Sequence, residues 1–345
     1  MLEVTAEKNN LVFGEAHSFS LNFQRTLRIP DDDKTYPLPP GLGQFPIMCV
    51  DDYRDRVPQS WRERGGFFIP MYQREALWIR FRGRQWHPNA VKIGIGRVNA
   101  VSGKPWQDEL LPYEDDYVVS PPQPWLDGIN AGDGFIRQFV AMPLGMGYTV
   151  EAQITGEEVF GGIQIIVYEP VPGKFPDQPP TPSPWDDRVG FGLKSLGEVP
   201  PSPIVTRGAE MGLGAGGRMK QKIYPDRHGY DTWDATNYGR VDVHIVNSMM
   251  FREITGMEPP ATPITAKTYA KHKYPWFDLY DEHLDDLHAP YSLQQVKSVK
   301  QMDEDKGFAP QQDDDSLEIT DEQVITYDMD ADKGVKPEAG NDKEQ

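Results

Sequence analysis

The side chains best suited to binding a ligand lie in one glycine-rich stretch near the middle of the chain. Residues 127–134 read Asp-Gly-Ile-Asn-Ala-Gly-Asp-Gly, which brings Asp127, Asn130 and Asp133 into a single turn. Carboxylate and amide oxygens on a flexible loop suit hard cations such as Ca²⁺. The same residue types also form Asx turns, in which they bond only to nearby backbone. The stretch is therefore either a Ca²⁺ site, with no other cofactor predicted, or a structural turn.

Trp125 and Arg137 flank this turn and extend it to a candidate ligand-binding loop over residues 123–138. A tryptophan in a loop offers a flat apolar face and one N–H donor to a sugar or a protein. The chain has eight tryptophans, and several stand beside a proline or a turn. The alternative interpretation is that these rings cover the ends of a β core.

A second glycine-rich stretch, residues 212–217, satisfies the pattern Gly-x-Gly-x-x-Gly. A dinucleotide site needs a strand before this pattern and a helix after it. Here only about seven residues separate the pattern from Pro225, so no such unit fits. Because Arg218, Lys220 and Lys222 follow directly, we interpret the stretch as an anion-contacting loop.

Other reactive residues lack a catalytic setting. No His stands near Cys49 in sequence, and a free cysteine is commonly buried. Residues 281–288 would align Asp281, Asp285 and His288 on one face of a helix, which favours a solvated face over a zinc site. Residues 328–334 imitate an EF-hand start, but the glycine comes one place late. The sequence contains no Gly-x-Ser-x-Gly, His-Glu-x-x-His or Cys-x-x-Cys, so we predict no catalytic residue.

The elements that position these residues are mostly strands. The chain has 345 residues with 32 Gly and 32 Pro, which favours many turns and few long helices. Short segments rich in apolar and β-branched residues, bounded by turn residues, predict antiparallel strands of a β-sandwich or barrel-like core. These segments are residues 18–29, 66–72, 76–81, 90–98, 135–142, 148–155 and 163–170.

The composition divides the chain into four parts. Residues 1–170 form the predicted β core, and 171–203 form a proline-rich linker or arm with a PxxP-like pattern. Residues 204–300 are predicted to pack on the core. They contain a strand at 240–246, with Asp242 and His244 alternating against apolar residues, and short helices at 247–256 and 265–272.

The fourth part, residues 301–345, is predicted to be a disordered acidic tail, with 15 acidic residues against four lysines. Two short apolar segments, 317–320 and 324–327, are the exceptions that could dock on a surface. The whole chain has a net charge of −18, which makes nucleic acid an unlikely partner. Without the tail the charge is −7, and residues 54–84 are locally basic, so we expect the tail to shield that region.

The predicted location is the cytoplasm. The first residues lack a basic start followed by an apolar segment, and no stretch approaches 18 apolar residues. One cysteine cannot form an intramolecular disulfide, which excludes a disulfide-built secreted domain.

Five segments together resemble a widespread bacterial family of uncharacterised proteins. The resemblance covers most of residues 20–285 and leaves the acidic tail outside. It implies a stand-alone bacterial protein and transfers no catalytic or binding residue. The segments that carry it lie at residues 27–30 with 36–43, 123–128, 137–145, 211–221 and 274–278.

Two functions remain open from the sequence. The first is a non-enzymatic β-rich protein that binds a partner or assembles with itself, with the proline-rich arm making subunit contacts. The second is a ligand-binding or cation-binding β-sandwich, which could be an enzyme, that uses the loop at 123–138 with Asp127, Asp133 and Arg137 as its polar groups.

Overall fold

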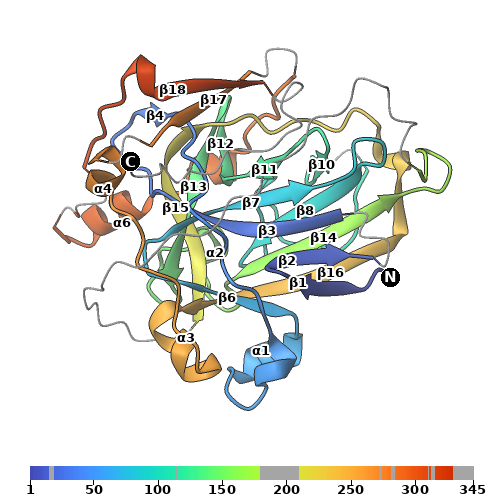
Figure 1. Ribbon diagram of the computed structural model, residues 1–345, viewed down its shortest axis with the longest axis horizontal. Coiled ribbons are helices and arrows are strands. Elements are labelled where there is room, and N and C mark those ends of the chain that lie inside the picture. The colour runs from blue at the N-terminus through green and yellow to red at the C-terminus, as the bar shows by residue number, and fades with distance from the viewer. Residues whose placement is uncertain are drawn as a thin grey trace, which may run out of the picture.

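The structure is a computed structural model, and it describes residues 1–14, 19–112, 115–178, 210–271, 274–280, 284–309, 311 and 315–328. The prediction of a mainly β fold with an antiparallel sandwich or barrel-like core is confirmed (Figure 1). The described strands are β1 (Val4–Glu7), β2 (Asn10–Phe13), β3 (Phe19–Thr26), β4 (Thr35–Tyr36), β5 (Met48–Cys49), β6 (Phe67–Met71), β7 (Ala76–Arg82), β8 (Asn89–Ile95), β9 (Val98–Asn99), β10 (Val118–Ser120), β11 (Trp125–Leu126), β12 (Gly128–Gly132), β13 (Phe135–Pro143), β14 (Ile163–Pro170), β15 (Glu210–Lys220), β16 (Trp233–Asn247), β17 (Trp276–Tyr280) and β18 (Val324–Asp328).

One large sheet contains 16 of these strands, and its main path runs β1-β2-β3-β7-β13-β15-β16-β14-β8-β10. Its pairs are antiparallel except for β4 with β15 and β6 with β16. The strands β15 and β16 come late in the chain, yet they lie in the middle of this path. The sheet is therefore continuous only when strands from both halves of the sequence are in place.

The core follows the alternation of the predicted strands. On β3 the side chains of Phe19, Leu21 and Phe23 are fully buried, and on β16 the side chains of Val243 and Ile245 are buried as well. Burial of such side chains is the main favourable contribution to folding. Asp242 and His244 take the opposite face of β16, as the alternation predicted.

The helices are short and lie around the sheet: α1 (Gln59–Arg64), α2 (Val150–Thr155), α3 (Ser248–Thr255), α4 (Ala266–Lys271), α5 (Tyr291–Gln294) and α6 (Val299–Asp305), with 3₁₀ turns at Val50–Tyr53, Tyr230–Thr232 and Asp321–Gln323. The predicted helix at 247–256 is confirmed as α3. The Asn247 side chain accepts a hydrogen bond from the backbone of Met249, and Gly256 ends the helix in a left-handed conformation. The predicted helical turn at 265–272 is confirmed as α4.

The segment at 148–155 was predicted to be a strand, and this prediction is wrong. It is helix α2, which begins at an N-cap, Thr149, and ends at Gly156 with a φ of 81°. By residue type this segment favours a strand, because it contains Thr149, Val150, Ile154 and Thr155. The N-cap and the left-handed glycine instead define a short helix. Tertiary contacts of Glu151, described below, hold it in place.

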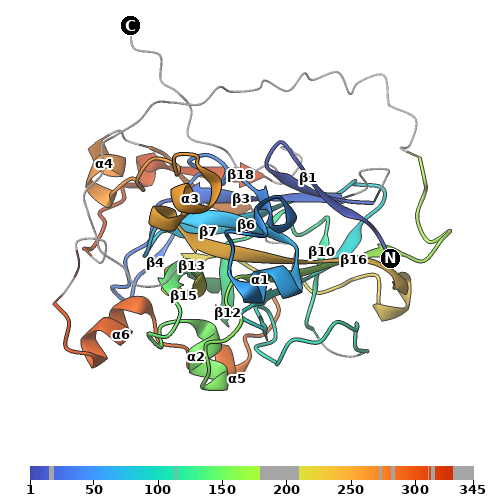
Figure 2. The same ribbon diagram turned by 90° about the horizontal axis from the view of Figure 1, so that it is seen from below.

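All the described helices except α4 gather at two sides of the sheet (Figures 1 and 2). The pair α1 and α3 lies side by side and shares a cluster in which Trp61 and Phe251 pack with Phe68 of β6 (Figures 1 and 2). Figure 2 shows α2, α5 and α6 together on another side, away from β1 and β3.

The acidic tail departs from the predicted disorder in two places. Residues 299–305 form α6, and residues 324–328 form β18, which pairs in parallel with β17. Leu317 and Val324 also pack against the main core. The docking of 324–327 that the sequence left open is therefore observed.

Some predicted features lie outside the described residues. These are most of the proline-rich arm, from residue 179 on, and the end of the tail, residues 329–345. Within the described part of the chain, no helix combines the length and the apolar character needed to cross a membrane.

Candidate functional site

The predicted loop at 123–138 is largely a pair of strands, because β12 and β13 form a hairpin with Asn130 opposite Ile136. The Asp127 side chain is fully buried, and the Gln221 side-chain amide donates to it at 2.8 Å. Asn130 is 2% exposed and donates to the backbone carbonyls of Leu287 and His288. These contacts fix the chain around the hairpin.

The third residue of the predicted cation site, Asp133, lies at the exposed tip, where its carboxylate is 2.9 Å from His288 Nδ1. The three oxygens thus face different partners. Among the described residues, no group of three or more His, Cys, Asp or Glu side chains is placed to hold a metal. From the sequence, a helix was considered over residues 281–288. Residues 284–290, which include Asp285 and His288, form no helix, so that prediction is wrong for them. Ca²⁺ binding stays a prediction.

Trp125 belongs to the core. Its ring is 1% exposed and packs edge to face on Trp78 at a centroid distance of 6.0 Å. Trp61 and Trp78 are equally buried. These three rings are therefore buried in the core.

The glycine-rich stretch at 212–217 was predicted to be a loop, but it lies inside strand β15. Glycines occur in strands where another backbone approaches closely. A methyl group on Gly217 would overlap the carbonyl oxygen of Pro30, and one on Gly214 would lie 2.8 Å from the carbonyl oxygen of Tyr148. The pattern therefore reflects packing of neighbouring segments on the strand.

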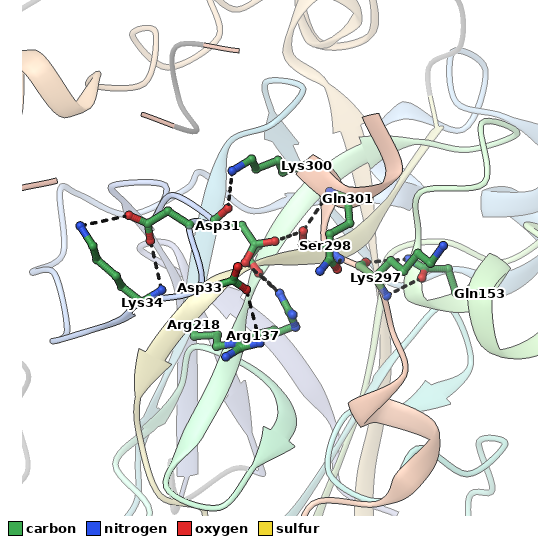
Figure 3. Close-up of polar contacts among 12 residues, drawn as sticks. Asp31, Asp33, Lys34, Arg137, Gln153, Arg218, Lys297, Ser298, Lys300 and Gln301 are labelled. Atoms are coloured by element: carbon green, nitrogen blue, oxygen red, sulfur yellow. Dashed lines mark hydrogen bonds and ion pairs between the residues drawn. The ribbon is translucent and has the colours of Figure 1, made fainter. Parts of the chain in front are cut away.

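Arg137 forms an ion pair with Asp31 (Figure 3) and also donates a hydrogen bond to the Gly216 carbonyl of β15. Its Nη1 lies 3.2 Å from Asp31 Oδ1, and both side chains are less than 10% exposed. The Ser298 hydroxyl, at the N-cap of α6, donates to the other oxygen of Asp31, and Lys300 donates to its backbone carbonyl at 2.9 Å. A buried ion pair thus joins β13, the segment after β3, and α6.

The basic residues of the predicted anion-contacting loop have separate partners. Arg218 lies 3.8 Å from Asp33, and Lys220 lies 3.1 Å from Asp278. Lys222 donates to the backbone carbonyl of Leu284 at 3.1 Å. The three cations do not share one partner, and anion contact at this place stays a prediction.

A different cleft brings together arginines that the sequence keeps far apart. It has a volume of about 630 Å³ and lies where β1, β5, α1, β6 and β16 meet the turn after β8. We call it the arginine cleft. It is lined by Met1, Leu2, Val4, Cys49, Asp51, Glu63, Arg64, Gly66, Phe67, Arg97, Arg240, Val241 and Asp242.

Arg97 occupies a strained position in a two-residue hairpin turn. Ile95 and Val98 pair across the turn, and Gly96 and Arg97 have φ values of 56° and 64°. Such a turn normally carries Asn or Gly, since other residues cost roughly 1 kcal/mol there. Gln164 accepts from the Arg97 backbone N–H at 2.8 Å. A strained arginine held in this way indicates a role for its side chain.

The Phe160 ring covers two of the arginines. Its centroid lies 4.9 Å from the Arg97 guanidinium carbon and 5.8 Å from that of Arg64. The buried Glu151 carboxylate holds this loop by accepting the backbone N–H groups of residues 159, 160 and 161 at 2.8–2.9 Å. Helix α2 therefore fixes the loop that positions the arginines.

Arg64 and Arg97 have no carboxylate within ion-pair distance among the described residues. Arg64 donates to the carbonyls of Ser60 and Phe160, and its Nη2 is buried without an acceptor. The Nε of Arg97 is also buried without an acceptor. A half-buried cation without a carboxylate at ion-pair distance is costly, so this arrangement favours an anion.

His244 lies behind the cleft and is buried against Trp61, with ring centroids 4.7 Å apart. Its Nε2 is 2.9 Å from the Gly65 carbonyl oxygen. Burial, with a smaller contribution from the Arg64 charge, lowers the pKa of His244 from 6.5 to about 3.

The His244 pKa predicts an acid sensitivity. Below pH 6.5 the unfolded chain binds a proton at this histidine and the folded chain does not, so stability falls by roughly 1.4 kcal/mol per pH unit down to pH ~3. His244→Gln keeps an N–H donor and removes the titration, so denaturant unfolding at pH 6.5 and 4.5 should show a smaller loss. The exposed His288→Gln is the control. An equal loss in His244→Gln and the wild type would contradict the prediction.

A smaller cleft of about 390 Å³ lies beside the start of the predicted loop. Gln123 and Pro124 line it together with Arg80 and Arg82. Asp127, Asn130, Asp133 and Arg137 do not line it. Most of the polar groups chosen from sequence therefore line neither this cleft nor the arginine cleft.

Sequence reasoning missed Arg97, Phe160 and the pairing of Arg64 with them. Arg64 was noted only as part of a basic segment. A signal for Arg97 existed, because Gly-Arg between two apolar residues occupies a turn where Asn-Gly is usual. The position of Phe160 depends on contacts of Glu151 that no local pattern shows.

The chain was compared with protein-family models, curated proteins and solved structures, and no match was found in any of them.

Proposed function

We propose that the protein is a non-enzymatic β-rich binding protein and that the arginine cleft binds a small anionic ligand. The observation that carries this proposal is the pair of half-buried guanidinium groups, Arg64 and Arg97, which face one cleft without a carboxylate partner among the described residues. Phosphate and carboxylate groups match the planar fork of an arginine.

Two further features support a binding role. The cleft volume of about 630 Å³ lies in the range of small-molecule sites. The Arg97 side chain is held at both ends, by the hairpin turn and by the Phe160 ring, so little side-chain entropy is lost when an anion binds.

The test is calorimetric titration with inorganic phosphate, sulfate and citrate. Arg97→Gly suits the left-handed turn and should leave the melting temperature nearly unchanged, while the loss of a charged hydrogen bond weakens binding at least about tenfold. Arg252→Ala, which removes an exposed arginine on α3, is the matched control and should bind as the wild type does. No heat of binding for any anion in the wild type would refute the proposal.

Self-association is a second candidate, favoured by the way β18 adds to β17. The two strands pair in parallel from Trp276 opposite Val324 to Tyr280 opposite Asp328, and on its other side β17 exchanges two backbone hydrogen bonds with Leu38. A strand supplied from the tail could equally come from a second copy. The proline-rich arm predicted to make subunit contacts lies mostly outside the described residues.

Mass photometry over a concentration series tests this candidate. Strand exchange predicts dimers at micromolar concentration, and Ile325→Pro, which removes a ladder hydrogen bond in β18, should reduce them. A monomer at every concentration would refute it. The cytoplasm remains the proposed location.

A further inference from the structure

The arginine cleft also contains a carboxylate that lacks a hydrogen-bond donor. Asp242 on β16 is 7% exposed, and its Oδ1 is buried without a partner. Its Oδ2 lies 3.9 Å from Arg240, but that arginine makes a shorter ion pair of 2.5 Å with Asp108. A buried carboxylate oxygen without a donor is unfavourable unless a ligand supplies one.

The negative and positive groups of the cleft are neighbours in the sheet. Gln164 of β14 lies opposite Asp242 in the register, and the same side chain accepts the backbone N–H of Arg97. On the other side, the backbone of Gly66 packs so closely on the Asp242 backbone that a methyl group would not fit, and Arg64 lies two residues earlier. Asp242 therefore lines the same cleft as Arg64 and Arg97.

We propose that the ligand of the cleft is a small zwitterion, in which an ammonium group stands a few bonds from a phosphate or carboxylate. Arg64 and Arg97 bind the anionic group. The Asp242 carboxylate, which lines the cleft and whose Oδ1 accepts no hydrogen bond from the described residues, accepts one from the ammonium. This inference rests on the proposed anion-binding function and specifies the class of ligand. A simple anion leaves Asp242 without a donor, whereas a zwitterion satisfies both charges at once.

Phosphoethanolamine and phosphocholine are the probes that test it. They have similar charge, but the trimethylammonium group of phosphocholine has no N–H to donate. Calorimetric titration of the wild type should show at least about tenfold tighter binding of phosphoethanolamine, the effect of one charged hydrogen bond.

Two variants assign this preference to residues. Asp242→Asn has the same shape and should remove the preference while phosphocholine binds as before. Arg97→Gly should weaken the binding of both compounds. Equal binding of the two compounds by the wild type would overturn the zwitterion and leave the anion site intact. Failure of both compounds and of inorganic phosphate to bind would overturn the proposed function itself.

The same chemistry occurs in free metabolites and in lipid headgroups. Co-sedimentation with phosphatidylethanolamine vesicles and not with phosphatidylcholine vesicles would assign the zwitterion to a lipid. Binding of phosphoethanolamine without sedimentation on either vesicle would assign it to a soluble compound.

Discussion

Replacing Gly217 by alanine is expected to destabilise the protein by about 3 kcal/mol or more. The added methyl group would overlap the carbonyl oxygen of Pro30, which is backbone and cannot rotate away. Gly217 also donates its N–H to the Ile29 carbonyl at 3.3 Å, beside a bulge where two residues of β15 face one residue of β13. The substitution would push away the segment after β3, which carries Asp31. It would therefore also weaken the ion pair between Asp31 and Arg137.

The neighbouring Gly216 provides the matched control. A methyl group there meets Val140 Cγ2 at 2.8 Å and Gln138 Cβ at 3.2 Å, which are side-chain atoms and not a backbone oxygen as at Gly217. Because alanine also lowers the entropy of the unfolded chain, the net loss in Gly216→Ala should be clearly smaller than that in Gly217→Ala. Denaturant unfolding of the two variants measures the difference. Equal stability would show that the glycine pattern does not serve close packing and would reopen a ligand-binding role for residues 212–217.

Asp31→Ala should cost about 3–5 kcal/mol, because it leaves the buried Arg137 charge without its carboxylate. It also removes the acceptor of the Ser298 hydroxyl, so α6 should loosen from the sheet (Figure 3). Hydrogen exchange should therefore increase in α6 first.

A double-mutant cycle isolates this pair. Arg137→Met alone leaves Asp31 unpaired, but combined with Asp31→Ala it should restore part of the lost stability. Lys34→Ala serves as control, since the Lys34–Asp32 pair spans 3.6 Å with a Lys34 side chain that is 59% exposed, and its loss should cost less than about 1 kcal/mol. Strictly additive losses in the cycle would contradict the buried pair as the source of the effect.

The fold could be predicted from sequence where local patterns are strong. Alternation of apolar residues identified β3, β7, β14 and the second half of β16, and capping residues identified α3. The failures have a common cause. Helix α2 and the glycine-rich strand β15 depend on what lies against them: Glu151 accepting three N–H groups, and Pro30 packing on Gly217. Such contacts depend on the fold and leave no periodic or capping pattern in the sequence.

The site was less predictable than the fold. Residues chosen for their chemistry, such as Asp127 and Arg137, have buried partners and act as structural contacts. The arginine cleft combines Arg64 of α1, Arg97 of the turn between β8 and β9, and Asp242 of β16. Only the sheet order brings them together, and a single sequence does not give that order.

Alkylation of Cys49 is the most direct measurement of the proposed binding site. Cys49 is the single cysteine of the chain, it is half-buried, and it lines the arginine cleft. Phosphoethanolamine at about ten times its Kd should therefore slow the reaction of Cys49 with iodoacetamide about tenfold in the wild type. At the same concentration it should slow the reaction in Arg97→Gly by no more than about twofold, because binding there is at least about tenfold weaker. An unchanged rate in the wild type, at a concentration where calorimetry shows saturation, would contradict the assignment of the ligand to this cleft.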